Sequence, residues 1–509
     1  MMLLTSSLVA TAAESTNYLG MLAVVINGNV VESTQNQITL DKQDDGKYGL
    51  TLKNFILVLE GQPMPVGNIV LKDIEAVTEE GEPVKQEITI EDGDLPGIPE
   101  WVGPLLGSVP VEVKAVVNGD ILTADIAVPL VGQDVKVVFD SRTFQLPNAG
   151  FEEFHTVTVT GLFGKGSSDE PNNWHSFMSC TGSFASMVNS VPHTFIGEET
   201  RPGSNGSKSV LVKSALVAGY VANGTLTTGQ LKAGAMTPEN TDNNAFLNFA
   251  NEAKDANGDP FYTVLNTLPD SISVWVKFKQ GGAVAEHSYA TMSAVITDGS
   301  YYQEPADKDY SSIIVGRTGS LIESTGEWQK ITAPFAYYDK TKSPKGILVT
   351  FSTNADPGEG TDNDELYIDD VELVYSSYLT DLAVNGTTLP GFASDKYNYE
   401  YNFAEGTMPT ADELADKISY VTGNEAKSFV SFGADNVMAI TVLSADLLSN
   451  RTYTIKFSAG TNGVESINNS NTVGKTVYNL GGQKMNAAKK GGVYITRYAD
   501  GKTVKSINK

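Results

Sequence analysis

The 509-residue chain is too long for one hydrophobic core, and a prior of about 150 residues per domain gives three or four domains. Its 35 basic residues stand against 61 acidic ones, and the formal net charge of −26 argues against nucleic acid or an anionic membrane as partner. Short runs rich in Val, Ile, Thr, Tyr and Phe, broken by Gly, Asn and Asp, predict a multidomain all-β protein. Helical spacing is convincing only in residues 410–421.

Residues 1–13 form a short apolar run that ends in Ala10, Ala12 and Ala13, as the end of a signal peptide does. The run lacks a basic start, so we expect a true start further upstream; the alternative is an irregular first strand. No other stretch approaches the length of a membrane-spanning helix. The single cysteine, Cys180, has no intrachain disulfide partner, and an oxidising compartment is compatible but not required. We therefore expect an exported protein, extracellular or associated with the cell surface or outer membrane, without a transmembrane segment.

Residues 14–141 read as alternating strands joined by tight turns such as Asn118-Gly119-Asp120. About eight meandering strands without a long helix predict a closed up-and-down barrel. The segments "YLGMLAVVINGNVV", "YGLTLKNF", "VGNIVLKDI" and "NGDILTADIAV" resemble the calycin-like (lipocalin-like) β-barrel domain of Bacteroidetes surface proteins. Such a barrel is either filled by side chains, the more common case, or holds a ligand, and the residues leave both open.

Residues 142–377 are also rich in strands, which alternate with long loops of Gly, Asn, Ser and Asp. The beginning "LPNAGFEEF", the strands "SISVWVKF" and "GEWQKITAPFAYY", and the end "ELYIDDVELVY" resemble a carbohydrate metabolism domain of Bacteroidetes. This family consists of jelly-roll β-sandwiches similar to carbohydrate-binding modules. The resemblance implies a jelly roll with a role in carbohydrate recognition or metabolism.

Residues 378–460 resemble the cadherin-like (Ig-like) β-sandwich found as a spacer in bacterial surface proteins, through "YLTDLAVNGTTLPGFASDKYNYEYNF" and "NRTYTIKF". Tyr397, Tyr399 and Tyr401 fall on one face of a strand. We expect them to cover a sandwich core, with a sugar-binding platform as the alternative.

Residues 461–509 read as a linker followed by a C-terminal β-hairpin module. The module resembles the C-terminal module of secreted Bacteroidetes proteins through Tyr478, Leu480, Gly482 and the "GGVYI" strand that begins at Gly491. It is rich in lysine, with Asp500 as its single acid. The resemblance implies a sorting signal or attachment to envelope components rather than nucleic-acid binding.

Enzyme motifs are mostly missing from the sequence. It contains no His-Glu-x-x-His zinc helix, no Gly-x-Ser-x-Gly turn and no phosphate-binding loop, and the four histidines lack metal-ligand spacing. Carboxylates are plentiful, but sequence does not show the separation that glycoside hydrolysis requires. Non-catalytic glycan binding is therefore our preferred function. A glycoside hydrolase or another carbohydrate-active enzyme is the first alternative, and a structural or adhesive surface protein the second.

The two ends of the 142–377 domain carry candidate ligands for calcium. The resemblance to calcium-stabilised carbohydrate-binding jelly rolls implies that Glu152 lies beside Asp369 or Asp370, because the chain ends of a jelly roll are neighbours. Asn148 belongs to a turn that could add oxygen ligands, and calcium binds six to eight oxygens. A structural Ca²⁺ is one hypothesis for these residues; the other is that these acids cap strand ends in solvent.

Sugar recognition requires flat aromatic faces and polar groups that reach the hydroxyls. Alternation along residues 271–279 places Trp275 on the face opposite the apolar residues Ile272, Val274, Val276 and Phe278. Trp275 is therefore the first candidate platform, unless a loop covers it as a second small core. Three further candidates are loop aromatics beside polar groups, namely Trp174, Tyr301 and Tyr302.

Overall fold

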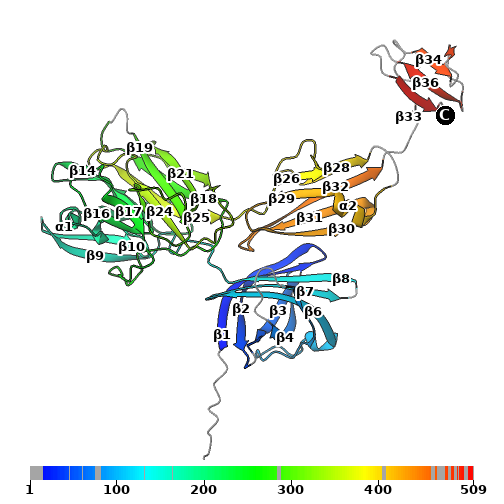
Figure 1. Ribbon diagram of the computed structural model, residues 1–509, viewed down its shortest axis with the longest axis horizontal. Coiled ribbons are helices and arrows are strands. Elements are labelled where there is room, and N and C mark those ends of the chain that lie inside the picture. Colours follow the sequence, from blue (N-terminus) through cyan, green and yellow to red (C-terminus); the bar gives the residue numbers. More distant parts are fainter. Residues whose placement is uncertain are drawn as a thin grey trace, which may run out of the picture. The chain divides into compact units, whose positions relative to one another are not determined.

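The computed structural model describes residues 15–44, 46–59, 61–74, 82–130, 132–162, 164–283, 288–403, 408–459, 465–466, 476–479, 483–486, 490, 492–497 and 503–507. The described chain is almost entirely β, as predicted (Figure 1). The predicted signal segment, residues 1–13, lies outside the described residues, as do Leu480, Gly482 and Gly491 of the C-terminal module. Within the described residues, no helix has the length and apolar character needed to cross a membrane.

The first eight strands form a nearly closed barrel. They run in the sheet order β4-β3-β2-β1-β8-β7-β6-β5. Backbone hydrogen bonds between Asn68 and Glu91, of 2.8 and 3.1 Å, join the two ends of this sheet. The side-chain amide of Gln86 adds bonds to both backbone groups of Lys72, of 2.9 and 3.1 Å. The strand bounds are β1 Ser15–Ile26, β2 Asn29–Lys42, β3 Tyr48–Leu59, β4 Gln62–Ile74, β5 Val84–Thr89, β6 Ser108–Asn118, β7 Ile121–Leu130 and β8 Gln133–Asp140, with a 3-10 turn η1 at Gly103–Leu106.

Alternation along the barrel strands directs their apolar residues inward. Leu22 on β1, Ile38 on β2 and Leu71 on β4 are fully buried in one cluster that draws residues from both halves of the sheet. This is the packing expected of a barrel filled by its own side chains.

The next segment forms a β-sandwich of two five-stranded sheets. The first sheet has the order β11-β12-β25-β18-β22 and the second the order β15-β24-β19-β21-β23. The first sheet consists of β11 Thr194–Gly197, β12 Ser209–Lys213, β18 Ser271–Lys279, β22 Gln329–Pro334 and β25 Glu365–Val374. The second consists of β15 Thr225–Thr227, β19 Tyr289–Thr297, β21 Ile314–Glu323, β23 Ala336–Tyr337 and β24 Gly346–Ser352.

Smaller elements surround the sandwich. A three-stranded sheet has the order β16-β17-β20, and two hairpins pair β9 with β10 and β13 with β14. Their bounds are β9 Phe154–Gly161, β10 Gly164–Pro171, β13 Ala215–Val217, β14 Tyr220–Ala222, β16 Gln230–Ala233, β17 Asn243–Leu247 and β20 Tyr302–Glu304; the short helices are η2 Phe177–Ser179 and α1 Ala185–Val188.

The sandwich core lies between the two large sheets. Ile272, Val274, Val276 and Phe278 of β18 are fully buried in it, which confirms the alternation predicted for this strand. From β19 of the opposite sheet, alternate residues such as Met292 enter the same core. The intervening residues of β19 and β24 therefore face outward from the second sheet, and this outward face carries the candidate site.

Residues 379–459 form a second, smaller β-sandwich with sheet orders β27-β26-β29 and β28-β32-β31-β30. Tyr399 is buried and stacks on Phe392, Tyr397 packs on Tyr453, and Tyr401 on Phe457, which confirms the interpretation as a core cover. The bounds are β26 Leu379–Val384, β27 Thr387–Thr388, β28 Asn398–Phe403, β29 Ile418–Thr422, β30 Lys427–Phe432, β31 Val437–Leu443 and β32 Asn450–Ala459, with a 3-10 turn η3 at Ala434–Asn436.

The helix α2 is shorter than its spacing predicts. It runs over Ala411–Lys417 and begins with a capping box between Thr410 and Glu413. The prediction that it extends to Val421 is wrong, because β29 starts at Ile418 and joins β26 in a sheet. Tyr and β-branched residues favour a strand there.

The C-terminal strands form a small sheet in the order β33-β37-β36-β34-β35. Their bounds are β33 Glu465–Ser466, β34 Thr476–Asn479, β35 Lys484–Met485, β36 Val493–Arg497 and β37 Thr503–Ile507.

Candidate functional site

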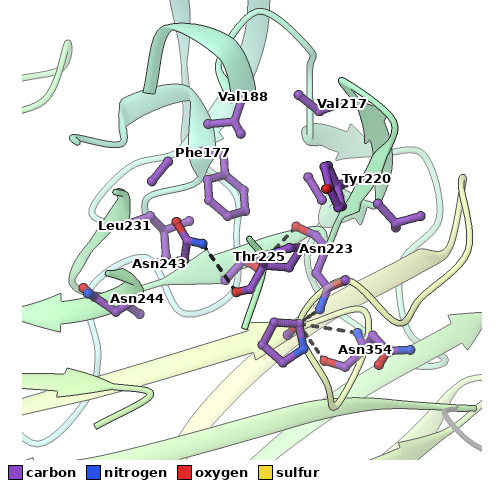
Figure 2. Close-up of a pocket in the computed structure, with 18 of the residues that line it drawn as sticks. Phe177, Val188, Val217, Tyr220, Asn223, Thr225, Leu231, Asn243, Asn244 and Asn354 are labelled. Carbon is purple, nitrogen blue, oxygen red and sulfur yellow. Dashed lines mark hydrogen bonds between the residues drawn. The ribbon is translucent and has the colours of Figure 1, made fainter. Parts of the chain in front are cut away.

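A pocket of about 370 Å³ lies on the outward face of the second sheet (Figure 2). Small hydroxyl side chains line it from three neighbouring strands of that sheet. These positions alternate with core residues, so the strand pleat itself sets them on the outward face. They are Thr225 of β15, Thr291 and Ser293 of β19, and Thr350 and Ser352 of β24.

The surrounding elements supply a largely apolar wall. Phe177 of η2 and Val188 of α1 lie on one side with Leu231 of β16 (Figure 2). The hairpin β13–β14 contributes Tyr220, whose side chain is 50% exposed and therefore free to meet a ligand. Further lining residues include Phe184, Met187, Val217, Ala233, Ala235, Met236, Pro238 and Ala245.

Asparagine amides add polar groups to this wall. Asn243 is committed to the fold: its side-chain oxygen accepts hydrogen bonds from the backbone N–H groups of Gly234 and Ala235, both 3.0 Å. Asn244 donates to the carbonyl of Thr241 at 2.8 Å, but its own side-chain oxygen is buried without a hydrogen-bond partner. The side-chain oxygen of Asn223 is likewise buried and unpaired. An unpaired buried acceptor is costly, so the Asn223 oxygen favours a ligand that brings a donor. By strand alternation, the Asn244 side chain lies on the face of β17 opposite the lining residue Ala245.

Glu304 is the one carboxylate among the described residues that line the pocket. Its two oxygens accept hydrogen bonds from Ser293 Oγ at 2.7 Å and from the Tyr302 hydroxyl at 2.8 Å. Burial, followed by the nearby Glu304 charge, raises the pKa of Tyr302, so this hydroxyl remains a neutral donor. The carboxylate is thus held in place by the protein.

A second polar cluster lies in the same domain, around Asp255. Its Oδ2 atom is 3.4 Å from Nε2 of His175 and 3.5 Å from Nε2 of His155, while its Oδ1 atom accepts N–H bonds from Asn257 and Asp259. Burial raises the pKa of Asp255, but the contact with His175 and the N–H of Asp259 lower it by more, so the net shift is downward. No group of three or more His, Cys, Asp or Glu in the described part of the chain has the arrangement of a metal site.

The sequence did not predict this cluster, because its histidines lie in separate segments without metal-like spacing. A local signal does exist in "DANGD", where Asp255 accepts N–H bonds from the residues two and four positions later.

Trp275 faces outward from the first sheet, as predicted from alternation, and does not line the pocket. Its ring is half-buried, and the guanidinium of Arg201 lies 5.7 Å from the ring centroid. The side chain of Arg201, a loop residue, therefore lies over part of the ring. Its role as a sugar platform stays a prediction.

Two of the remaining aromatic candidates require correction. Trp174 is fully buried in the sandwich core, where it packs on Phe151 and Phe351 and donates to the carbonyl of Pro147 at 3.1 Å. Tyr302 is 2% exposed. Neither ring offers a face to a ligand. Polar neighbours in the sequence suggested exposed loops, but the fold buries both rings.

Tyr301 is 39% exposed, stacks on Phe246 and donates to the side chain of Gln303. Like Trp174, Trp275 and Tyr302, it is not among the residues that line the pocket. Its role in ligand binding stays a prediction.

The two chain ends of the sandwich lie side by side, as expected. The side-chain amide of Gln145 bonds both backbone groups of Leu373, at 2.7 and 2.8 Å, and the N–H of Val371 donates to the carbonyl of Ala149 at 2.9 Å. The turn that contains Asn148 therefore lies beside β25, which carries Asp369 and Asp370, but Glu152, Asp369 and Asp370 do not form a group with the arrangement of a metal site among the described residues.

Each calcium candidate has partners within the protein. Glu152 accepts N–H bonds from Ser207 and Lys208, and Asn148 accepts one from Glu153. Arg201 donates its Nε–H to Asp370 at 2.6 Å and its backbone N–H to Asp369 at 2.9 Å.

The pKa values of Glu152 and Asp369 are shifted in opposite directions. Burial raises the pKa of Glu152, but the hydrogen bonds from Lys208 and Ser207 lower it by a larger amount, so the net shift is downward. Burial raises the pKa of Asp369 to about 6, and its Oδ1 atom has no hydrogen-bond partner. Arg201 and Lys208 supply positive charge here, and calcium stays a prediction.

Comparison with known proteins shows that one domain is similar to a known family. Residues 15–141 match the model described as "Calycin-like beta-barrel domain", which agrees with the barrel described above. No match was found among curated protein sequences.

Several solved structures show distant likeness. A provisionally assigned glycoside hydrolase from Bacteroides thetaiotaomicron shares 15% identity over 53% of this chain and 86% of its own, with a TM-score of 0.32. A provisionally assigned outer membrane protein from Bacteroides fragilis shares 12% identity over 66% of this chain and 96% of its own, with a TM-score of 0.18. A structure of carbohydrate-binding modules from the β-sandwich superfamily shares 8% identity over 70% of this chain and 97% of its own, with a TM-score of 0.21. Function must therefore be argued from this chain's own residues.

Proposed function

We propose that the domain spanning residues 142–377 binds a glycan without catalysis, in the pocket on the second sheet. The observation that carries this proposal is the combination of a hydroxyl-lined floor, the exposed ring of Tyr220 and the unpaired amide oxygen of Asn223 around one cavity. Sugar rings present both C–H faces that stack on aromatic rings and hydroxyls that need donors and acceptors. The pocket offers both kinds of group.

The same pocket favours binding over hydrolysis. Glycoside hydrolysis by the usual routes requires two carboxyl groups, one on each side of the scissile bond. The described lining residues include one, Glu304, and it is held by Ser293 and Tyr302. A glycoside hydrolase remains the alternative function, and it predicts release of reducing ends from a polysaccharide panel.

The first experiment is a glycan array probed with the full-length protein, followed by calorimetry with each hit. Tyr220→Ala is expected to weaken binding at least tenfold, because it removes an exposed ring from the pocket wall. Tyr338→Ala is the matched control, since Tyr338 is 64% exposed and does not line the pocket. Equal loss in both variants, or no loss with Tyr220→Ala, contradicts the proposal.

We also propose that the protein works outside the cytoplasm, exported and held at the cell surface or envelope of a Bacteroidetes bacterium. The signal-like residues 1–13 and the lysine-rich C-terminal module support this proposal. Detection of the intact chain on the surface of cells, by protease shaving, tests it; protection from protease in intact cells that persists after permeabilisation of the outer membrane contradicts it.

A further inference from the structure

Glu304 brings a negative charge into the wall of the pocket. It lies on β20 opposite Ala245 of β17, and both residues line the pocket. Its side chain is 20% exposed, and Ser293 and Tyr302 donate hydrogen bonds to its two oxygens. Both donors are neutral hydroxyls, so they fix the position of the carboxylate without cancelling its charge.

Little positive charge lies close enough to offset Glu304. None of the described residues that line the pocket is Lys, Arg or His. Arg317 of β21 lies 3.5 Å from a Glu304 oxygen, but its side chain is 47% exposed and does not line the pocket. Because water screens an exposed ion pair, Arg317 offsets the charge of Glu304 only in part. The pocket therefore presents a net negative charge to a ligand.

The apolar wall makes this charge matter more. Phe177, Val188 and Leu231 carry no dipole that could stabilise a second negative charge (Figure 2). A uronic acid, sialic acid or sulfated sugar would lose hydration on entry and find no lining cation in return. A neutral sugar avoids this cost, and its hydroxyls can donate to the Glu304 oxygens, since a carboxylate accepts more than two hydrogen bonds.

From these observations we infer that the pocket binds a neutral glycan and that Glu304 is the residue that rejects anionic ones. The inference rests on the proposed glycan-binding function and adds the charge class of the ligand. In this arrangement a sugar hydroxyl donates to Glu304, whereas a carboxylate or sulfate group at the same place is repelled.

The test begins with the full-length protein on a glycan array that carries neutral, uronic-acid, sialylated and sulfated glycans. Every glycan whose binding falls with Tyr220→Ala is expected to be neutral. Each such oligosaccharide with primary hydroxyls is then compared by calorimetry with its copy oxidised to the uronic acid. The oxidised copy is expected to bind about tenfold more weakly or worse, because like charges repel.

Variants separate the effect of charge from that of lost contacts. Glu304→Gln keeps the shape of the side chain without its charge, and is expected to reduce the affinity ratio between neutral and oxidised sugar several-fold. Arg317→Met removes the nearby cation and is expected to increase that ratio. Glu323→Gln is the matched control, because Glu323 is an exposed acid of β21 outside the pocket. Raising salt from about 0.05 M to about 0.5 M should also shrink the ratio of the wild-type protein.

The outcomes separate this inference from the proposed function. If anionic glycans bind in a Tyr220-dependent way as tightly as neutral ones, or if Glu304→Gln changes the ratio no more than Glu323→Gln, the charge assignment is wrong although the pocket binds glycans. Should Glu304→Gln fail to fold, a ratio that does not rise in Arg317→Met overturns the inference instead. If no glycan binds, or if Tyr220→Ala leaves all binding unchanged, both proposals fail.

Discussion

Gln145 joins the first segment of the jelly-roll domain to its last strand by pairing its side-chain amide with both backbone groups of Leu373. The amide reproduces the two hydrogen bonds that a neighbouring strand would make. Gln86 does the same for Lys72 at the seam of the barrel. In both domains, one glutamine side chain closes a sheet edge that the backbone leaves open.

Gln145→Ala is expected to destabilise the jelly-roll domain by about 1–3 kcal/mol, because it leaves partly buried backbone groups of Leu373 unpaired. Calorimetric unfolding of the full-length protein should show the loss in the transition of this domain. Gln86→Ala, whose bonds lie at an exposed seam, serves as comparison and is expected to cost less. A larger effect from Gln86→Ala would show that the closing role of Gln145 is overstated.

Trp174→Ala is expected to cost about 3–5 kcal/mol of folding free energy, since the ring is fully buried against Phe151 and Phe351. Trp174→Phe should retain most of the packing and lose the bond to Pro147. Urea titration followed by fluorescence distinguishes the two. Near-wild-type stability of Trp174→Ala would mean that Trp174 is a surface residue after all.

Asp369 makes stability fall as pH rises. Its pKa is raised to about 6 in the folded state by burial, against about 4 in the unfolded chain, so the folded state holds the proton longer. The protonated carboxyl contributes stability below pH 4 that is lost as pH rises to 6, by at most about 3 kcal/mol.

Asp369→Asn removes this titration and keeps an acceptor for the Arg201 N–H. Relative to wild type, the variant should therefore gain stability from pH 4 to pH 7, as measured by urea titration at each pH with EDTA present. A constant difference between the two proteins across this range would show that Asp369 does not titrate there.

Arg201 is expected to compete with calcium for the carboxylate of Asp370. Calcium should raise the Tm of Arg201→Gln more than that of the wild-type protein, because the variant frees Asp370 from the guanidinium. Magnesium at the same concentration controls for ionic strength. A Tm unchanged by calcium in both proteins would remove Glu152, Asp369 and Asp370 as calcium ligands.

The strands and cores could be predicted because alternation is a local property of the sequence. The burial of Ile272, Val274, Val276 and Phe278, and the outward direction of Trp275, follow from period-two spacing alone. The end of α2 was missed because the pairing of β29 with β26 is a long-range interaction. Trp174 was misjudged for the same reason, since its polar neighbours in sequence are not its neighbours in the core.

The pocket could not be predicted from the sequence. Its lining residues come from many separated segments and are ordinary Thr, Ser, Ala and Asn residues without a motif. What makes Asn223 informative is an unpaired oxygen, and pairing is known only once the fold has placed every neighbour. Aromatic residues were the visible candidates, while Tyr220, whose exposed ring lines the pocket, lies in a hairpin that the sequence analysis did not single out.

The most direct measurement is a crystal structure of the protein with a bound oligosaccharide taken from the glycan array. The account predicts sugar density over Thr350 and Ser352 on the outward face of the second sheet, in contact with Tyr220. Density over Trp275 on the first sheet instead, with the pocket empty, would contradict it.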